Sequence, residues 1–174
     1  MTAPIKELNL KGKVAVVTGG GGVICSTMAR ALAMHGAKTA ILDLNLEAAQ
    51  KVAAEIEAET GAKSVGFAAN VLDRASLEAA KKAINSELGK IDFLVNGAGG
   101  NAATATSKVE KMEKGDNLED TFFGLQLEGF DKTFDLNFKG TLLPTMIFAQ
   151  DMLELGKGGI VNISSMNSYR PLTR

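Results

Sequence analysis

The sequence is poor in the side chains that build disulfides and metal sites. It has one cysteine, Cys25, and one histidine, His35, among 174 residues. A single cysteine excludes an intrachain disulfide, and one histidine beside one cysteine leaves no zinc-type cluster of ligands. We therefore expect neither a disulfide nor a bound metal ion.

Excess charge and long hydrophobic runs are also missing. The 19 basic and 20 acidic residues give a net charge of −1, which creates no general field to attract nucleic acid or an anionic membrane. No uninterrupted apolar run reaches the ~18 residues of a membrane span, and residues 1–13 lack the apolar core of a signal peptide. These absences favour a cytoplasmic protein with no nucleic acid and no membrane as partner.

What is present is a regular alternation of strand-like and helix-like apolar patterns over a length that fits one domain, residues 1–174. The expected strands are Lys13–Thr18, Lys38–Leu42, Ser64–Ala68, Ile91–Val95 and Gly159–Ile163. Helical stripes lie between them and end at Gly36, Gly61 and Gly89, and Asp73 can cap the third helix. The order predicts an α/β fold with a doubly wound parallel sheet.

The regular pattern lapses between the fourth and fifth strands. Residues 97–129 are polar and long for a connection within a domain, so the segment is either functional or mobile. Asp131–Leu155 then reads as one long helix that Pro144 should kink. This helix is apolar on more than one side, which predicts a subunit contact and a homo-oligomer.

Glycines directly follow the first strand, in the segment Thr18–Cys25. In parallel sheets ligands bind at the carboxyl ends of the strands. Glycines there let the backbone approach a pyrophosphate at the N-terminus of the next helix, although a merely tight turn is the alternative. Asp43 ends the second strand, where a carboxylate accepts hydrogen bonds from the adenosine ribose. Its alternative role is a helix cap, which Asn45 could equally provide.

Two further strand ends carry small or polar residues. Asn96–Gly100 would let a ligand lie against bare backbone, although a flexible exit into the long loop is the alternative. Asn162–Ser165 offers hydroxyls that could hydrogen-bond a substrate carbonyl. Serine is common at strand ends, so this last segment indicates nothing by itself.

Taken together, these segments resemble the short-chain dehydrogenase/reductase family over nearly the whole chain. The motifs are Val17–Gly20, Asp43, Asn70–Val71, Asn96–Gly99, Asn137 with Gly140, and Ile163–Ser165. The resemblance implies a Rossmann-like fold, NAD as cofactor, adenine contacts at Asn70–Val71, a proton-relay water at Asn137 and a substrate carbonyl at Ser165. The implied cofactor-binding residues are Gly19, Gly21, Gly22, Val23, Ile24, Asp43, Leu44, Asn70, Val71, Asn96, Ala98 and Gly99.

The sequence departs from the family pattern in three places. Val23 and Cys25 stand where the family has its second and third loop glycines, so the pyrophosphate turn should use Gly21 or Gly22 instead. Cys25 would lie at a helix N-terminus, which can lower a thiol pKa, although packing against the sheet is the simpler role. Asn70 replaces the usual aspartate, and its amide oxygen can still accept a hydrogen bond.

The family's catalytic tyrosine and the lysine four residues after it have no counterpart. Tyr169 is the only tyrosine, and Thr173 stands four positions later. The resemblance therefore predicts a chain that ends before the catalytic pair and before the last helix and strands of the sheet. Such a chain should bind cofactor without turnover.

Within the family, the stretches Thr18–Val23, Asn96–Asn101, Leu136–Pro144 and Ser165–Asn167 resemble the fructuronate reductase (D-mannonate oxidoreductase) branch. That resemblance implies a small-molecule substrate, a sugar acid. Arg170 would bind its carboxylate, and Asn101 would contact its hydroxyls. Other polyol or sugar dehydrogenases remain open. So does a non-catalytic dinucleotide-binding module, and more weakly a methyltransferase.

Overall fold

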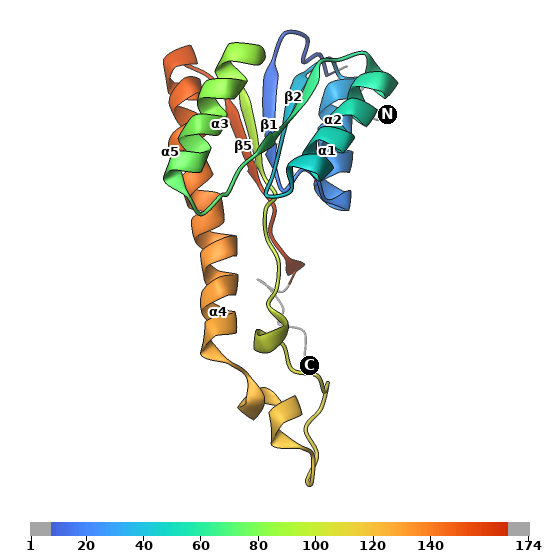
Figure 1. The fold of residues 1–174 in the computed structure, drawn as a ribbon, viewed down its shortest axis with the longest axis vertical. Coiled ribbons are helices and arrows are strands. Elements are labelled where there is room, and N and C mark those ends of the chain that lie inside the picture. Colours follow the sequence, from blue (N-terminus) through green and yellow to red (C-terminus); the bar gives the residue numbers. More distant parts are fainter. Residues whose placement is uncertain (1–7, 167–174) are drawn as a thin grey trace, which may run out of the picture.

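A computed structural model describes residues 8–166 and shows a five-stranded parallel sheet with helices on both faces (Figure 1). The strand order is β3-β2-β1-β4-β5. The strands are β1 (Val14–Thr18), β2 (Lys38–Asp43), β3 (Ser64–Ala68), β4 (Phe93–Asn96) and β5 (Gly159–Asn162). The helices are α1 (Val23–Met34), α2 (Leu46–Thr60), α3 (Arg74–Glu87), α4 (Leu127–Phe134) and α5 (Gly140–Leu155). This confirms the doubly wound α/β fold.

Each face of the sheet has its own hydrophobic core, because neighbouring strand residues point to opposite faces. Val16 and Leu42 pack with apolar residues of α3 and α5. Val17 and Ile41 pack with apolar residues of α1 and α2. All five residues of β1 are buried, which explains why its sequence reads as a continuous apolar run.

The expectation of one long helix over Asp131–Leu155 is wrong in its detail. Helix α4 begins earlier, at Leu127, and a π-helical turn at Asp135–Lys139 separates it from α5. The irregular turn thus precedes Pro144, which has no N–H to offer the carbonyl group one turn before it. Among residues 8–166, no helix combines the length and apolar character that crossing a membrane requires.

The long connection before α4 forms a projection, which we call the arm (residues 102–126). It extends beyond the carboxyl ends of the strands and lies beside α4 (Figure 1). Three short 3-10 turns, at Ala103–Ala105, Leu118–Asp120 and Phe122–Gly124, give the arm its local structure. Its base is fixed to α4 because the Thr133 hydroxyl accepts a hydrogen bond from Ala102 N (3.2 Å). Apart from these turns the arm is irregular, as the lapse of periodicity in the sequence indicated.

A buried carboxylate fixes α5 against the sheet and against α3. The Asp151 side chain is fully buried, accepts a hydrogen bond from Ile91 N (3.1 Å) and lies 3.1 Å from the Lys81 ammonium. Burial alone would raise the pKa of Asp151, but hydrogen bonds from Ile91, Lys81 and Asn85 outweigh burial and lower it. The folded state therefore favours the charged form.

We expect Asp151→Asn to lower the free energy of unfolding at pH 7 by about 1–3 kcal/mol, because a charged hydrogen-bonding partner is lost. The contribution of Asp151 is complete above its unfolded pKa of about 3.9 and is lost as the pH falls through the lower folded value. The variant should therefore lose less stability than the unmodified chain below about pH 4. Urea unfolding at pH 7 and pH 3 measures both effects.

Glu154→Gln is the matched control, because Glu154 is 61% exposed and its ion-pair partner within residues 8–166 is Lys90. An exposed ion pair contributes about 0–1 kcal/mol. Equal losses at pH 7 for both variants would contradict the role assigned to Asp151.

Candidate functional site

The reversal of strand order between β1 and β4 places two loops side by side at the carboxyl end of the sheet. Thr18 and Asn96, the last residues of these strands, are in register. The buried Thr18 hydroxyl accepts hydrogen bonds from Gly97 N (3.1 Å) and Ala98 N (3.2 Å). Thr18 therefore joins the loop after β1 to the loop after β4, at the position where ligands bind in such sheets. In the sequence Thr18 stands out only as part of the motif Val17–Gly20, and no local pattern indicates this role.

The N–H groups of the glycine loop are engaged within the protein, and those that follow them at the start of α1 are free. Gly20 N donates to Leu42 O (3.0 Å), Gly21 N to Asp43 Oδ2 (3.1 Å) and Gly22 N to Gly19 O (3.1 Å). Among the described residues we find no acceptor for the next two N–H groups, those of Val23 and Ile24. The N-terminus of a helix attracts anions through such free N–H groups and its partial positive charge.

Close packing explains why the first loop residue is glycine. Gly19 has φ +65°, and a Cβ atom there would lie 2.9 Å from the Ala98 Cα atom. The two loops thus approach each other so closely that no side chain fits between them. Gly21 and Gly22 shape the turn as expected, but their own N–H groups are engaged within the protein.

Asp43 lies beside this loop at the end of β2. One carboxylate oxygen accepts the Gly21 N–H and the other accepts the Asn45 N–H (3.0 Å). The α2 cap is Asn45, whose side chain accepts a hydrogen bond from Ala48 N (3.1 Å). Asp43 therefore does not cap the helix, and each of its oxygens keeps a lone pair for a further donor. Leu44 follows as an exposed side chain (73%).

A second cluster surrounds a pocket of about 500 Å³ where the loop after β4 meets the π-helical turn, the start of α5 and the segment after β5. Its lining includes Ala98, Gly99, Asn101, Asn137 and Ser165. Asn137 lies in the π-helical turn, and its side chain bonds both the carbonyl (2.8 Å) and the N–H (3.1 Å) of Gly100. The pocket thus brings together Ala98 and Gly99, expected to contact the cofactor, with Asn101, Asn137 and Ser165, expected near the substrate. Arg170 lies outside the described residues.

The Asn96 side chain connects the elements around this pocket. Its side chain is buried (2% exposed) and donates to Thr145 Oγ1 (2.9 Å) and Asn162 Oδ1 (2.8 Å). It therefore links β4 to α5 and β5, and it is not among the residues that line the pocket. The carbonyl oxygen of Asn96 accepts the Ile163 N–H (3.0 Å), and its Oδ1 atom is buried without a hydrogen-bond partner among the described residues.

Comparison with known proteins matches residues 13–174 to the family model described as short chain dehydrogenase. The chain belongs to the short-chain dehydrogenase family. An uncharacterized oxidoreductase of Bacillus subtilis, UxuB, is 45% identical over 98% of this chain and 60% of its own length. The D-threitol dehydrogenase of Mycolicibacterium smegmatis is 38% identical over 91% of this chain and 55% of its own length.

Solved structures agree with this assignment. A crystal structure of a candidate D-mannonate oxidoreductase from Haemophilus influenzae, with bound NAD, superposes with a TM-score of 0.89. It is 45% identical, over 95% of this chain and 59% of that one. An NAD⁺-bound xylitol dehydrogenase superposes with a TM-score of 0.78 at 28% identity, over 94% and 58% of the two chains. The chain thus spans about three fifths of the length of these short-chain dehydrogenases.

The residues that resemble the family's adenine contacts shape a turn in this short-chain dehydrogenase. The Asn70 side chain accepts a hydrogen bond from Leu72 N (2.9 Å), just before Asp73 caps α3. Val71 is buried (6% exposed) against Gly140 of α5. Asn70 itself is exposed.

Cys25 packs against the sheet in this chain. Its Sγ lies 3.6 Å from the Gly97 carbonyl oxygen, and burial together with the nearby Asp43 charge raises the pKa of the thiol. The suggestion that the helix N-terminus lowers this pKa is therefore wrong, because desolvation of the thiolate dominates.

The described pocket contains hydroxyl and amide groups but no ionisable side chain. Its polar side chains belong to Asn101, Asn137, Thr141, Ser164 and Ser165. Among residues 8–166, no group of three histidine, cysteine or acidic residues is arranged to hold a metal ion. These groups can orient a carbonyl or a water molecule, but they are poor proton donors near neutral pH.

Proposed function

We propose that this chain binds NAD and is part of an oxidoreductase that interconverts a hydroxyl and a carbonyl group on a sugar acid or polyol. The observation that carries the proposal is the pairing of two features at one edge of the sheet. The free N–H groups of Val23 and Ile24 suit a pyrophosphate, and the Asp43 carboxylate beside them suits the ribose hydroxyls and repels a 2′-phosphate.

The cofactor would lie across the carboxyl ends of β1 and β4, with its pyrophosphate at α1. Its nicotinamide end would reach the pocket that contains Asn137 and Ser165. Gly99 packs so closely against Asn137 that a Cβ atom there would lie 2.7 Å from Asn137 Oδ1, so glycine is required beside this pocket. When bound, NAD supplies or accepts the hydride.

The substrate class rests on the relatives. The proteins most similar in sequence and structure include ones named for D-threitol, D-mannonate and xylitol, all polyhydroxylated compounds. We propose that Ser165 hydrogen-bonds the substrate carbonyl and that Asn101 contacts a substrate hydroxyl. Arg170 remains our candidate for a carboxylate anchor, because a guanidinium binds a carboxylate through two parallel hydrogen bonds.

Cofactor titration tests the proposal directly. We expect NADH fluorescence to rise on titration with the chain and to saturate, with NADPH binding at least about tenfold more weakly because Asp43 repels the 2′-phosphate. Absence of NADH binding, or equal affinity for NADPH, would contradict it.

A second candidate function is dinucleotide binding without catalysis. It is favoured by the lack of an ionisable side chain in the described pocket. In either case we propose a homo-oligomer. Phe130, Phe134 and Phe138 expose 44%, 60% and 55% of their surface along α4 and the π-helical turn, as a subunit contact would require.

A further inference from the structure

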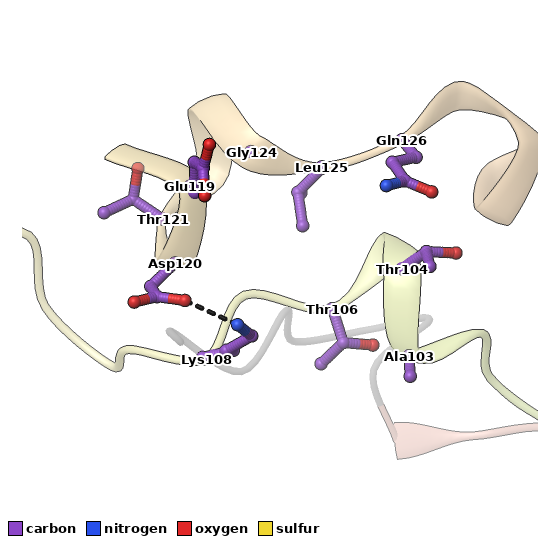
Figure 2. Close-up of a pocket in the computed structure, with 10 residues that line it drawn as sticks. All are labelled: Ala103, Thr104, Thr106, Lys108, Glu119, Asp120, Thr121, Gly124, Leu125 and Gln126. Carbon is purple, nitrogen blue, oxygen red and sulfur yellow. Dashed lines mark hydrogen bonds and ion pairs between the residues drawn. The ribbon is translucent and has the colours of Figure 1, made fainter. Parts of the chain in front are cut away.

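The arm encloses a second pocket, of about 650 Å³, between residues 103–108 and residues 119–126 (Figure 2). Two backbone hydrogen bonds bracket it: Lys108 N donates to Asp120 O (3.0 Å), and Gln126 N donates to Thr104 O (2.9 Å). Between these bonds the two segments separate and leave the space that the pocket fills. Its volume lies in the usual range of small-molecule sites.

The pocket is built into the arm by close packing at its base. Gly129 of α4 lies so near that a Cβ atom there would approach the Thr104 hydroxyl to 2.5 Å and Ala105 N to 2.9 Å. The Thr133 hydroxyl donates to Gly129 O (2.8 Å) while it accepts the Ala102 N–H. Helix α4 therefore holds residues 102–105, one side of the pocket, in place without a ligand.

An ion pair with spare hydrogen-bonding capacity stands at one end of the pocket. Lys108 Nζ lies 2.6 Å from Asp120 Oδ1, and Asn117 holds the other Asp120 oxygen (3.3 Å). The hydrogen bond to Asp120 raises the pKa of Lys108, and the same bond lowers the pKa of Asp120, so both stay charged at neutral pH. The ammonium keeps two further donors and the carboxylate keeps further lone pairs.

This arrangement matches two neighbouring hydroxyl groups. One hydroxyl can accept from the Lys108 ammonium while the next donates to the Asp120 carboxylate. At the other end Gln126 offers an amide donor and acceptor, and Leu125 points between the segments as an apolar surface for C–H groups (Figure 2). A free carboxylate is disfavoured, because the charged lining residues Lys108, Glu119 and Asp120 sum to −1.

We propose that the arm pocket binds a neutral polyhydroxylated compound, a linear polyol or a sugar, with Lys108 and Asp120 as its main polar contacts. The proposal concerns the arm alone and does not depend on the dinucleotide site. The hydroxyl-bearing chain of a substrate and a separate polyol ligand share this chemistry.

Saturation-transfer NMR and calorimetric titration with D-mannitol test the proposal, with gluconate as the acidic comparison and saturating NADH present or absent. We expect mannitol to bind with a millimolar Kd and gluconate to bind no more tightly. Lys108→Met should weaken mannitol binding about tenfold or more, through loss of a charge-assisted hydrogen bond. Gln126→Leu should also weaken it.

Lys111→Met is the matched control, because Lys111 is an exposed arm residue outside the pocket lining. It should leave mannitol binding unchanged, and circular dichroism should show both lysine variants folded. Tighter binding of gluconate than mannitol would overturn the ligand class, and equal mannitol binding by both lysine variants would overturn the site. NADH binding measured in the same samples tests the proposed function separately, since the Lys108 variant should retain it.

Discussion

The 174-residue chain should bind NADH yet show no measurable hydride transfer to fructuronate or to a polyol-derived ketone. Reduction of a carbonyl needs a proton delivered to the developing alkoxide by an acid within about 3 Å. The described pocket offers amides and aliphatic hydroxyls, and Tyr169 lacks a lysine four residues later. His35 follows the C-terminal end of α1, at the opposite edge of the sheet, where its Nδ1 lies 3.1 Å from Leu8 O.

The expected deficit is large. Positioned acid–base catalysis contributes about 10²- to 10⁴-fold to a rate, so loss of the acid alone should lower turnover by that factor. Absorbance at 340 nm follows the reaction, with NADH fluorescence in the same buffer showing that cofactor is bound. The xylitol dehydrogenase whose NAD⁺-bound structure is similar to this chain, assayed with xylitol and NAD⁺, is the positive control. Turnover by the 174-residue chain at a comparable rate would show that an acid outside our assignment acts in catalysis.

Replacement of Asp43 by alanine should weaken NADH binding about 10- to 150-fold, because hydrogen bonds to a charged group contribute ~1.5–3 kcal/mol. NADPH binding should weaken less, since repulsion of the 2′-phosphate is removed together with the hydrogen bonds. The preference for NADH should therefore shrink or disappear. Parallel fluorescence titrations with both cofactors measure the two affinities.

Two further variants separate the ribose contact from the structure of the loop. Asp43→Asn keeps acceptor oxygen for one of the Gly21 and Asn45 N–H groups but removes the charge, so it should lose NADH affinity while the fold is retained. Glu47→Gln removes a neighbouring exposed charge in the first turn of α2 and should change neither affinity. Unaltered NADH affinity in both Asp43 variants would remove Asp43 from the binding site.

Much of the fold was predictable because its signals are local. The β3 bounds, Ser64–Ala68, agree with the sequence prediction at both ends, and Asp73 caps α3 as expected. A continuous apolar run between turn residues is typical of a strand buried on both faces of a parallel sheet, so the alternation of runs and stripes also predicted the architecture. Family motifs singled out Asn137 and Ser165, and both residues line one pocket.

The contacts between residues distant in sequence were not predictable in this way. Whether Asp43 or Asn45 caps α2 depends on the approach of Gly21 to the Asp43 carboxylate, 22 positions apart. The raised pKa of Cys25 depends on burial against Gly97, which local position at a helix N-terminus does not reveal. Such effects depend on distances that only the packed chain sets.

The sequence by itself therefore determined the sheet, its helices and the family, since periodicity, caps and motifs are properties of short segments. Tertiary structure decided that Thr18 joins two loops, that Val23 and Ile24 carry the open N–H groups, and that the arm encloses a pocket beside Lys108 and Asp120. Each of these features consists of hydrogen bonds or close contacts between separate segments. Their existence follows from how the elements pack, because no local pattern encodes which donors remain free after folding.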